Sequence, residues 1–207
     1  MGSKTKKVPK ASSKVNKEAT HYHHGDLRQA CLEGALKFIE QGEPNFSLRD
    51  LARKIGVSHQ APYHHFKSLG ELLAGLAEAG YSEFANKLLE ARSKAKGRAL
   101  PAMGLAYTRF AYEKPHHYRL MFLDARVRIG EHAGLGAEAE RSFSELLKGV
   151  EHDYKSQRLS RAQILSKAAA VWSFTHGLSC LLLDGRLDIC GLKAPLSQKD
   201  FDGLSPV

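Results

Sequence analysis

The feature that most constrains this chain is a short helix pattern over residues 47–56 that is closed at both ends. Ser47 and Asp50 have the spacing of a capping box, in which each side chain binds the other residue's backbone amide at a helix start. Apolar residues then recur at helical spacing, and Gly56 tolerates the positive φ of a tight turn. Because Ser58 can begin another helix directly after that turn, the pattern predicts a helix-turn-helix.

Helical patterns also flank this motif. Asp26 can cap a preceding helix, whose apolar residues recur three and four positions apart. The residues around Gly42 are expected to end this helix. The helix that starts at Ser58 is expected to reach about His65, although Pro62 within it removes one amide donor. Ser68 and Glu71 then predict a second capping box, which opens a long helix to about residue 96.

The net charge of +9 is concentrated at the N-terminus. Residues 1–20 hold six lysines and one acid, and residues 1–70 hold 12 basic and 6 acidic side chains. Segments this basic and poor in apolar residues do not bury enough surface to fold, so residues 1–22 are expected to form a disordered arm. The arm either tracks phosphates or is a solubilising tail or expression remnant, and the charge as a whole favours a nucleic-acid partner over a membrane.

Several classes of protein are disfavoured. The three cysteines are far apart and odd in number, which argues against a disulfide scaffold or a zinc ribbon. No apolar run is long enough to span a membrane and no secretory signal is present, so we expect a cytoplasmic protein. His64 and His65 point about 100° apart on a helix, and no other metal-ligand pattern occurs, so neither a metal site nor a cofactor is expected.

The chain after residue 70 is expected to be helical throughout. Apolar spacing predicts helices over residues 99–113, around 118–122, over 137–154 and over 161–184, with a loop over 124–136 and a brief helix within 192–204. The stretch 168–183 is almost wholly apolar, so its helix should be buried on several sides, including against a second subunit. The fold class is therefore all-α, with a helix-turn-helix domain over residues 23–70 and a second helical domain over residues 71–207.

Two parts of the sequence resemble the tetracycline-repressor (TetR) family. Residues 46–58 and 61–68 resemble its DNA-binding domain, and the match extends from Gly25 to Leu76. Trp172, His176 and Gly177, followed by residues 183–185, resemble the "WHG" subgroup of its C-terminal domains, as do residues 110–121. The resemblance implies a homodimer that binds operator DNA and releases it when a small-molecule effector enters the C-terminal domain.

Candidate DNA contacts follow from chemistry and motif position together. Polar side chains at the start of the recognition helix reach base edges, and hydroxyls, amides and cations at helix ends suit phosphates. The candidates are Ser47, Arg49, Ser58, His59, Gln60, Ala61, Tyr63, His64, His65 and Lys67. Each could instead belong to a solvated polar face. Leu69 and Gly70 depart from the family pattern, in which Lys and an acid are usual, so one phosphate contact is expected to be missing.

Candidate ligand contacts combine flexible methionines with flat aromatic rings, which suit a small apolar or aromatic ligand. They are Met103, Tyr107, Phe110, Met121, Phe122, Phe143, Trp172 and His176. His176 is either a polar anchor or a satisfied core histidine, and simple core packing is the alternative for the others. The function expected is a repressor released from a palindromic operator. The alternatives are a basic helical protein that binds nucleic acid without sequence preference, and a helical enzyme or interaction module, against which the absence of any catalytic motif argues.

Overall fold

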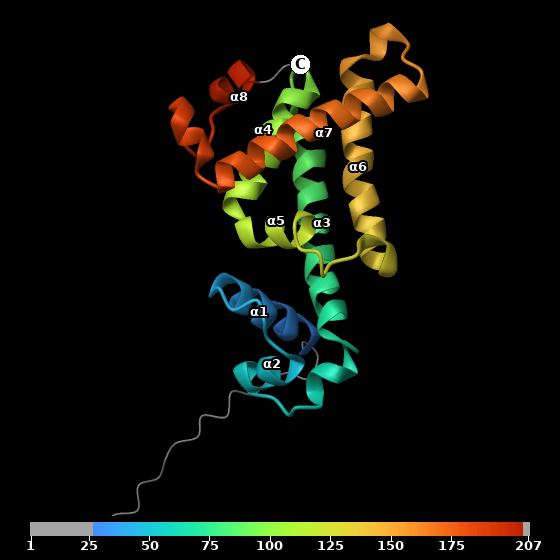
Figure 1. The fold of residues 1–207 in the computed structure, drawn as a ribbon. Coiled ribbons are helices and arrows are strands. Elements are labelled where there is room, and N and C mark those ends of the chain that lie inside the picture. Colours follow the sequence, from blue (N-terminus) through green and yellow to red (C-terminus); the bar gives the residue numbers. More distant parts are fainter. Residues whose placement is uncertain (1–26, 205–207) are drawn as a thin grey trace, which may run out of the picture.

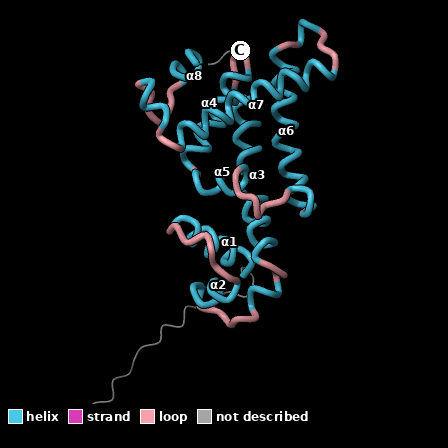
Figure 2. Tube along the Cα trace, viewed as in Figure 1, coloured by secondary structure: helices cyan, strands magenta, loops and turns pink. Residues whose placement is uncertain are grey.

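The structure is a computed structural model that describes residues 27–204. Residues 1–26 lie outside the described residues. They include the basic arm over residues 1–22 with His21, the nearby His23 and His24, and the predicted capping residue Asp26. Within residues 27–204 every regular element is a helix, which confirms the predicted all-α class (Figure 2). None of the helices in this range has the length and hydropathy needed to cross a membrane.

The head of the molecule, residues 27–68, contains α1 (Leu27–Glu40), α2 (Leu48–Ile55) and the 3₁₀ helix η1 (Ala61–His64). The predicted capping box is present: Ser47 Oγ accepts from Asp50 N at 3.1 Å, and Asp50 Oδ2 accepts from Ser47 N at 3.0 Å. Gly56 ends α2 with φ 75° and ψ 29°, as the turn requires. The head is therefore a helix-turn-helix whose second helix is fixed at both ends.

A glycine on α1 allows the two helices of the head to approach closely. A Cβ at Gly34 would lie 2.6 Å from Leu51 Cδ1 and 2.7 Å from Ile55 Cγ2. Ala52 of α2 is also fully buried. Phe46, which precedes the cap of α2, stacks on Phe38 of α1 with ring centroids 4.5 Å apart and closes the end of this interface.

The helix predicted over residues 58–65 is wrong in length and type. The regular element is only η1, and its first helical turn is not capped by a side chain. Pro62 has no N–H to give to the Ser58 carbonyl, so the bonds tighten to the i−3 pattern, from Ala61 N to Ser58 O and from Tyr63 N to Gln60 O. Pro62 and Phe66 are buried and hold this short segment against the rest of the head.

The helix α3 (Leu69–Lys94) connects the head to the body of the molecule (Figure 1). Its 26 residues correspond to about 39 Å at the usual rise per residue. The N-terminal part packs on the head, where Phe66 and Leu32 lie 3.3 and 3.5 Å from a Cβ built at Gly75. The second capping box is one-sided: Ser68 Oγ accepts from Glu71 N, but the Glu71 carboxylate accepts from Lys67 N instead of Ser68 N.

The body consists of α4 (Ala99–Glu113), α5 (Pro115–Phe122), α6 (Ala133–Asp153), α7 (Arg161–Leu183) and α8 (Gln198–Leu204), packed around the C-terminal part of α3. Figure 1 shows α6 running beside α3 and α7 crossing both. Ser160 caps α7 through a capping box with Gln163. The predicted brief C-terminal helix is α8, whose buried Phe201 lies against Gly104 of α4, where a Cβ would be 2.1 Å from the ring.

The loop predicted over residues 124–136 is shorter than expected, because α6 begins at Ala133 and a 3₁₀ turn covers Ile129–Glu131. Glycines at 134 and 136 indicated a break, but Leu135 between them is fully buried and anchors the first turn of α6. Gly134 lies against the Glu78 carboxylate, where a Cβ would be 2.5 Å from an oxygen. The glycine serves close packing of α6 on α3.

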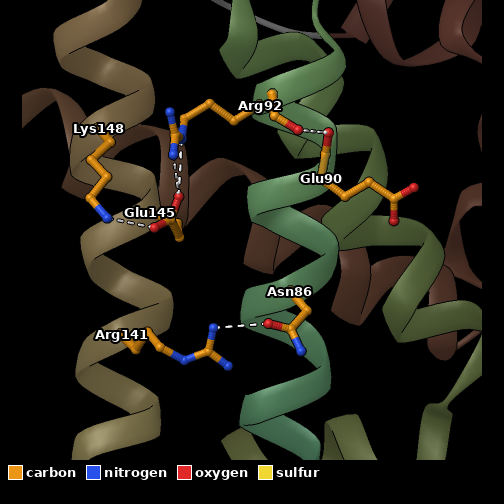
Figure 3. A network of polar contacts seen from close by, with 7 residues as sticks. Asn86, Glu90, Arg92, Arg141, Glu145 and Lys148 are labelled. Carbon is orange, nitrogen blue, oxygen red and sulfur yellow. Dashed lines mark hydrogen bonds and ion pairs between the residues drawn. The ribbon is translucent and has the colours of Figure 1, made fainter.

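Polar contacts join α3 and α6 along their length (Figure 3). The Glu145 carboxylate, whose side chain is 6% exposed, accepts from Arg92 Nη2 at 2.8 Å and from Lys148 Nζ at 2.6 Å. About one helical turn before Glu145 on α6, Arg141 donates to Asn86 Oδ1 at 3.0 Å and to the Ser82 carbonyl at 2.9 Å. These contacts fix the position of α3, the helix that carries the head, relative to α6.

Candidate DNA-reading surface and ligand pocket

The predicted DNA contacts gather around the turn between α2 and α3. All of them are exposed except Ala61, which is half-buried, and the Tyr63 ring is 49% exposed. Pro62 and Phe66 point inward within the same short segment. This division leaves a polar surface formed by His59, Gln60, Tyr63, His64, His65 and Lys67, which we call the reading surface.

Ser47 and Arg49 lie at the start of α2. The Ser47 hydroxyl is already engaged, since it donates to Asp50 Oδ2 at 2.6 Å and accepts from Asp50 N. Hydrogen bonds from Ser47 lower the pKa of Asp50, so a carboxylate stands beside the proposed phosphate position. Arg49 is exposed and makes no ion pair within residues 27–204, so it offers an available cation there.

The body contains a cavity of about 220 Å³ between α3, α4, α6 and α7. Five of the predicted ligand residues line it: Met103, Tyr107, Phe122, Phe143 and Trp172. Ten further lining residues were not predicted as ligand contacts: Tyr81, Phe84, Leu88, Gly104, Ile129, Ala139, Ser142, Leu146, Val171 and Thr175. The 3,4 spacing of Phe84 and Leu88 on α3 was visible in the sequence, but it does not distinguish a cavity wall from ordinary core.

Three predicted ligand residues do not line the cavity. Phe110 is fully buried and packs on Phe84 with centroids 5.1 Å apart. Met121 is buried against α3, where its sulfur lies 2.7 Å from a Cβ built at Gly80. His176 lies behind the cavity wall in a hydrogen-bonded cluster, as a satisfied core histidine. Core packing, the stated alternative, describes these three positions.

The cluster behind the cavity joins two tyrosines, His176 and Cys180. His176 Nδ1 lies 2.7 Å from the Tyr118 hydroxyl and 3.1 Å from the Tyr107 hydroxyl, and the two hydroxyls are 3.3 Å apart. Nε2 faces Cys180 Sγ at 3.7 Å. Nδ1 and the two hydroxyls therefore form one polar cluster within the helical body.

Burial keeps this region uncharged. It raises the pKa of Tyr81 to about 12 and the pKa values of Tyr107 and Tyr118 further above the ordinary tyrosine value. Burial also lowers the pKa of His176, which favours the neutral imidazole. None of the residues that line the cavity is an acid, a lysine or an arginine. The cavity is therefore suited to an uncharged molecule.

A helix-turn-helix head carried on a helix that also lines an apolar cavity defines a class, the helical DNA-binding regulators with a ligand-binding body. Comparison with known proteins agrees. Residues 32–76 match the family described as bacterial regulatory proteins, tetR family, and residues 100–198 match the tetracyclin repressor-like C-terminal domain. Together the two matches cover more than half of the chain, and the chain belongs to the TetR family of transcriptional regulators.

Solved structures show the same fold. The chain resembles a protein of unknown function from Rhodococcus sp. RHA1, with 26% identity and a TM-score of 0.73 over 89% of this chain and 94% of that one. It also resembles a TetR family regulator from Marinobacter aquaeolei VT8, with 16% identity and a TM-score of 0.62 over 86% and 92%. The regulator PfmR from Thermus thermophilus has 20% identity and a TM-score of 0.61 over 84% and 96%. No curated protein matches the chain in sequence.

Proposed function

We propose that the protein is a repressor that binds a palindromic operator as a homodimer and releases it when a small uncharged ligand fills the cavity. The observation that supports this best is the course of α3. The same helix packs on the head through its N-terminal part and lines the cavity through Tyr81, Phe84 and Leu88. A ligand that changes the packing around these side chains shifts the head, to the extent that it binds the two states with different affinity.

A second connection runs from the cavity to the head through the loop after α5. Phe122 and Ile129 flank this loop and both line the cavity. Between them, Asp124 holds the Arg126 guanidinium at 2.6 Å, and Arg126 Nη1 donates to the carbonyl oxygen of Pro44 at 2.7 Å. Pro44 lies in the turn between α1 and α2, so a movement of the loop is transmitted directly to the head.

The dimer is proposed to form through α7. No Asp, Glu, Lys or Arg occurs over residues 168–183, yet Leu165, Trp172 and Leu181 are 40%, 43% and 48% exposed in the single chain. A Cβ at Gly177 would meet nothing within 4 Å. A stretch of helix without charged side chains, with an open glycine and exposed apolar side chains, is typical of a surface that a second helix covers.

In the proposed complex, η1 and the turn before it enter the major groove. Gln60 and His59 have the donors and acceptors to read base edges, and the Ala61 methyl suits a thymine methyl. Tyr63, His65 and Lys67 contact the backbone or an adjacent base, with Ser58 and His64 beside them. Arg49 and the first amides of α2, next to Ser47, contact a phosphate. The proposed domains are residues 23–70 for DNA binding and 71–207 for ligand binding and dimerisation.

The test is selection of bound fragments from the source genome, followed by footprinting on those recovered. The proposal predicts protection of a short pseudo-palindrome, with recognition elements of the dimer entering successive major grooves about 34 Å apart. Binding of random DNA as tightly as the selected fragments would instead favour a protein that binds nucleic acid without sequence preference.

A further inference from the structure

The positive charge of the body is concentrated at the end of the molecule farthest from the head. This end is formed by the last turns of α3, the start of α4 and the connection between α6 and α7 (Figure 1). Residues 90–98 and 145–161, which we call the basic pole, hold 8 basic and 4 acidic side chains. The other 111 residues after position 70 hold 11 basic and 12 acidic ones. The excess positive charge of the body therefore lies at the basic pole.

A buried carboxylate holds the two segments of the basic pole together. Asp153 Oδ2 accepts from Leu100 N at 3.0 Å and lies 3.6 Å from Arg98 Nε, so the end of α6 is fixed against the start of α4. Lys167 Nζ lies 4.0 Å from the centre of the Tyr154 ring, which joins the start of α7 to the same end of α6. The cations of these segments therefore belong to one surface.

At the basic pole the cations are exposed, whereas half of the acids are withdrawn from the surface. The Glu145 side chain is 6% exposed and the Asp153 side chain 0%. Seven of the eight cations are exposed: Lys94, Lys96, Arg98, Lys148, Lys155, Arg158 and Arg161. Four of them make no ion pair within residues 27–204: Lys96, Lys155, Arg158 and Arg161. Positive charge that the fold leaves exposed and unneutralised attracts a polyanion.

Arg158 stands where the backbone favours a different residue. It adopts φ 45° and ψ 51°, in the left-handed region that usually selects glycine. Within residues 27–204 it is the only residue other than glycine with a positive φ. Its side chain is exposed, so packing gives no reason for an arginine there. A contact with a partner outside the chain gives one.

The composition of the basic pole favours the phosphates of DNA over a protein or a membrane as the partner. None of the exposed large apolar side chains of residues 27–204 lies within 90–98 or 145–161. Protein interfaces have apolar and aromatic centres and are poor in lysine, and binding to a membrane surface needs apolar side chains that insert. Exposed lysine and arginine without apolar neighbours are typical of sequence-independent binding to DNA phosphates.

The position of the basic pole decides which DNA it can contact. The helix α3 runs from the head to the pole and is about 39 Å long. DNA is stiff over roughly 150 bp, so a short operator at the reading surface does not bend back to the pole. We infer that the basic pole is a second, sequence-independent DNA-binding surface, through which protein bound to one DNA segment contacts another. The inference rests on the proposed function only for binding of the first segment.

A bridging assay tests this inference with the full chain. The tightest-binding fragment recovered from the genome is fixed to beads and captures the protein. After washing, a fluorescent duplex of unrelated sequence is titrated onto the beads. We expect the wild type to retain the fluorescent duplex, with an affinity that falls steeply as the salt concentration rises.

The variant K155Q/R158G/R161Q removes three cations that make no ion pair within residues 27–204, and glycine suits the backbone at position 158. We expect it to bind the fluorescent duplex at least tenfold more weakly. The slope of log affinity against log salt should fall by about 2–3, because each lost phosphate contact removes about 0.9. Its capture by the bead-bound fragment should stay within about twofold of the wild type, which also shows that the variant is folded.

Arg109, Arg128 and Lys193 provide the matched control, because they are exposed on other parts of the body. R109Q/R128Q/K193Q makes the same change in net charge, and we expect it to retain the fluorescent duplex as the wild type does.

Absence of retention by the wild type, or equal retention by K155Q/R158G/R161Q, would overturn the inference. An equal loss in the control variant would do the same, because net charge and not the basic pole would then be responsible. If polyglutamate displaces the fluorescent duplex as well as unlabelled duplex of equal charge, the partner is an acidic protein segment and the assignment to DNA is wrong. A protein that bridges two duplexes but has no sequence preference retains this inference and loses the proposed function.

Discussion

The ion pair between α3 and α6 gives a prediction that the structure makes quantitative. Glu145 is nearly buried, while its partners Arg92 and Lys148 are 24% and 50% exposed. Replacing Glu145 by Gln removes the negative charge and leaves two cations close together. Breaking a fully buried pair costs about 3–5 kcal/mol. Because both cations here reach solvent and glutamine can still accept one hydrogen bond, we expect a loss of about 2 kcal/mol.

The corresponding change in melting temperature follows from the chain length. A loss of 1 kcal/mol lowers Tm by about 2–4 °C in domains of 150–250 residues, so E145Q should melt about 4–8 °C below the wild type at pH 7. Both proteins must be compared at one concentration, because dimerisation makes Tm depend on concentration.

The effect should also depend on pH in a defined direction. Burial raises the pKa of Glu145, but hydrogen bonds from Lys148 and Arg92 and their charges outweigh it, so the pKa lies below the ordinary 4.5. A carboxyl with a lowered pKa in the folded state stabilises above its unfolded pKa and loses that contribution as the pH falls. The difference in Tm between wild type and E145Q should therefore be constant from about pH 8 to pH 5 and shrink below about pH 4.

Thermal unfolding followed by circular dichroism tests this prediction. The control is Glu90→Gln on α3, whose ion pair with Lys94 is exposed on both sides (59% and 74%), so this variant should melt at nearly the wild-type temperature. A Tm for E145Q equal to that of E90Q at pH 7, or a deficit that grows as the pH falls, would refute the reasoning.

Two further predictions concern function. Gly177→Leu should convert the dimer to a folded monomer, as measured by light scattering. The control Ser156→Leu, at an exposed position outside α7, should remain dimeric. A dimeric G177L would contradict the proposed interface. Arg126→Ala should preserve ligand binding by Trp172 fluorescence but weaken ligand-induced release of DNA several-fold, and undiminished release would show that the loop does not carry the coupling.

The sequence predicted local features well where one motif determines them. The capping box at Ser47 and the turn at Gly56 depend on residues three or four positions apart, and both are present. Of the box predicted at Ser68 only one half forms, because Ser68 accepts from Glu71 N while the Glu71 carboxylate accepts from Lys67 N. Pro62 signalled an irregular third helix, but the choice of a 3₁₀ turn depends on how Pro62 and Phe66 pack on the rest of the head. That packing involves residues distant in sequence.

The candidate pocket was predictable only in part, for a physical reason. Apolar side chains at helical spacing line a cavity and fill a core with the same pattern, so Met103 and Phe110 look alike in the sequence although only Met103 lines the cavity. The contacts of His176 with Tyr107 and Tyr118, which lie 69 and 58 residues away in the sequence, likewise depend on the assembled fold. Gly34 and Gly134 each permit a close approach between helices that only the assembled fold reveals.

The central claim, a sequence-specific regulator that acts through the reading surface, is tested most directly by one ratio of affinities. Fluorescence anisotropy at a fixed salt concentration would compare the palindromic fragment recovered from the genome with a scrambled fragment of equal length. The account predicts a preference of about 10³-fold or more for the palindrome. A ratio near one would contradict it, because phosphate contacts alone cannot discriminate between the two sequences.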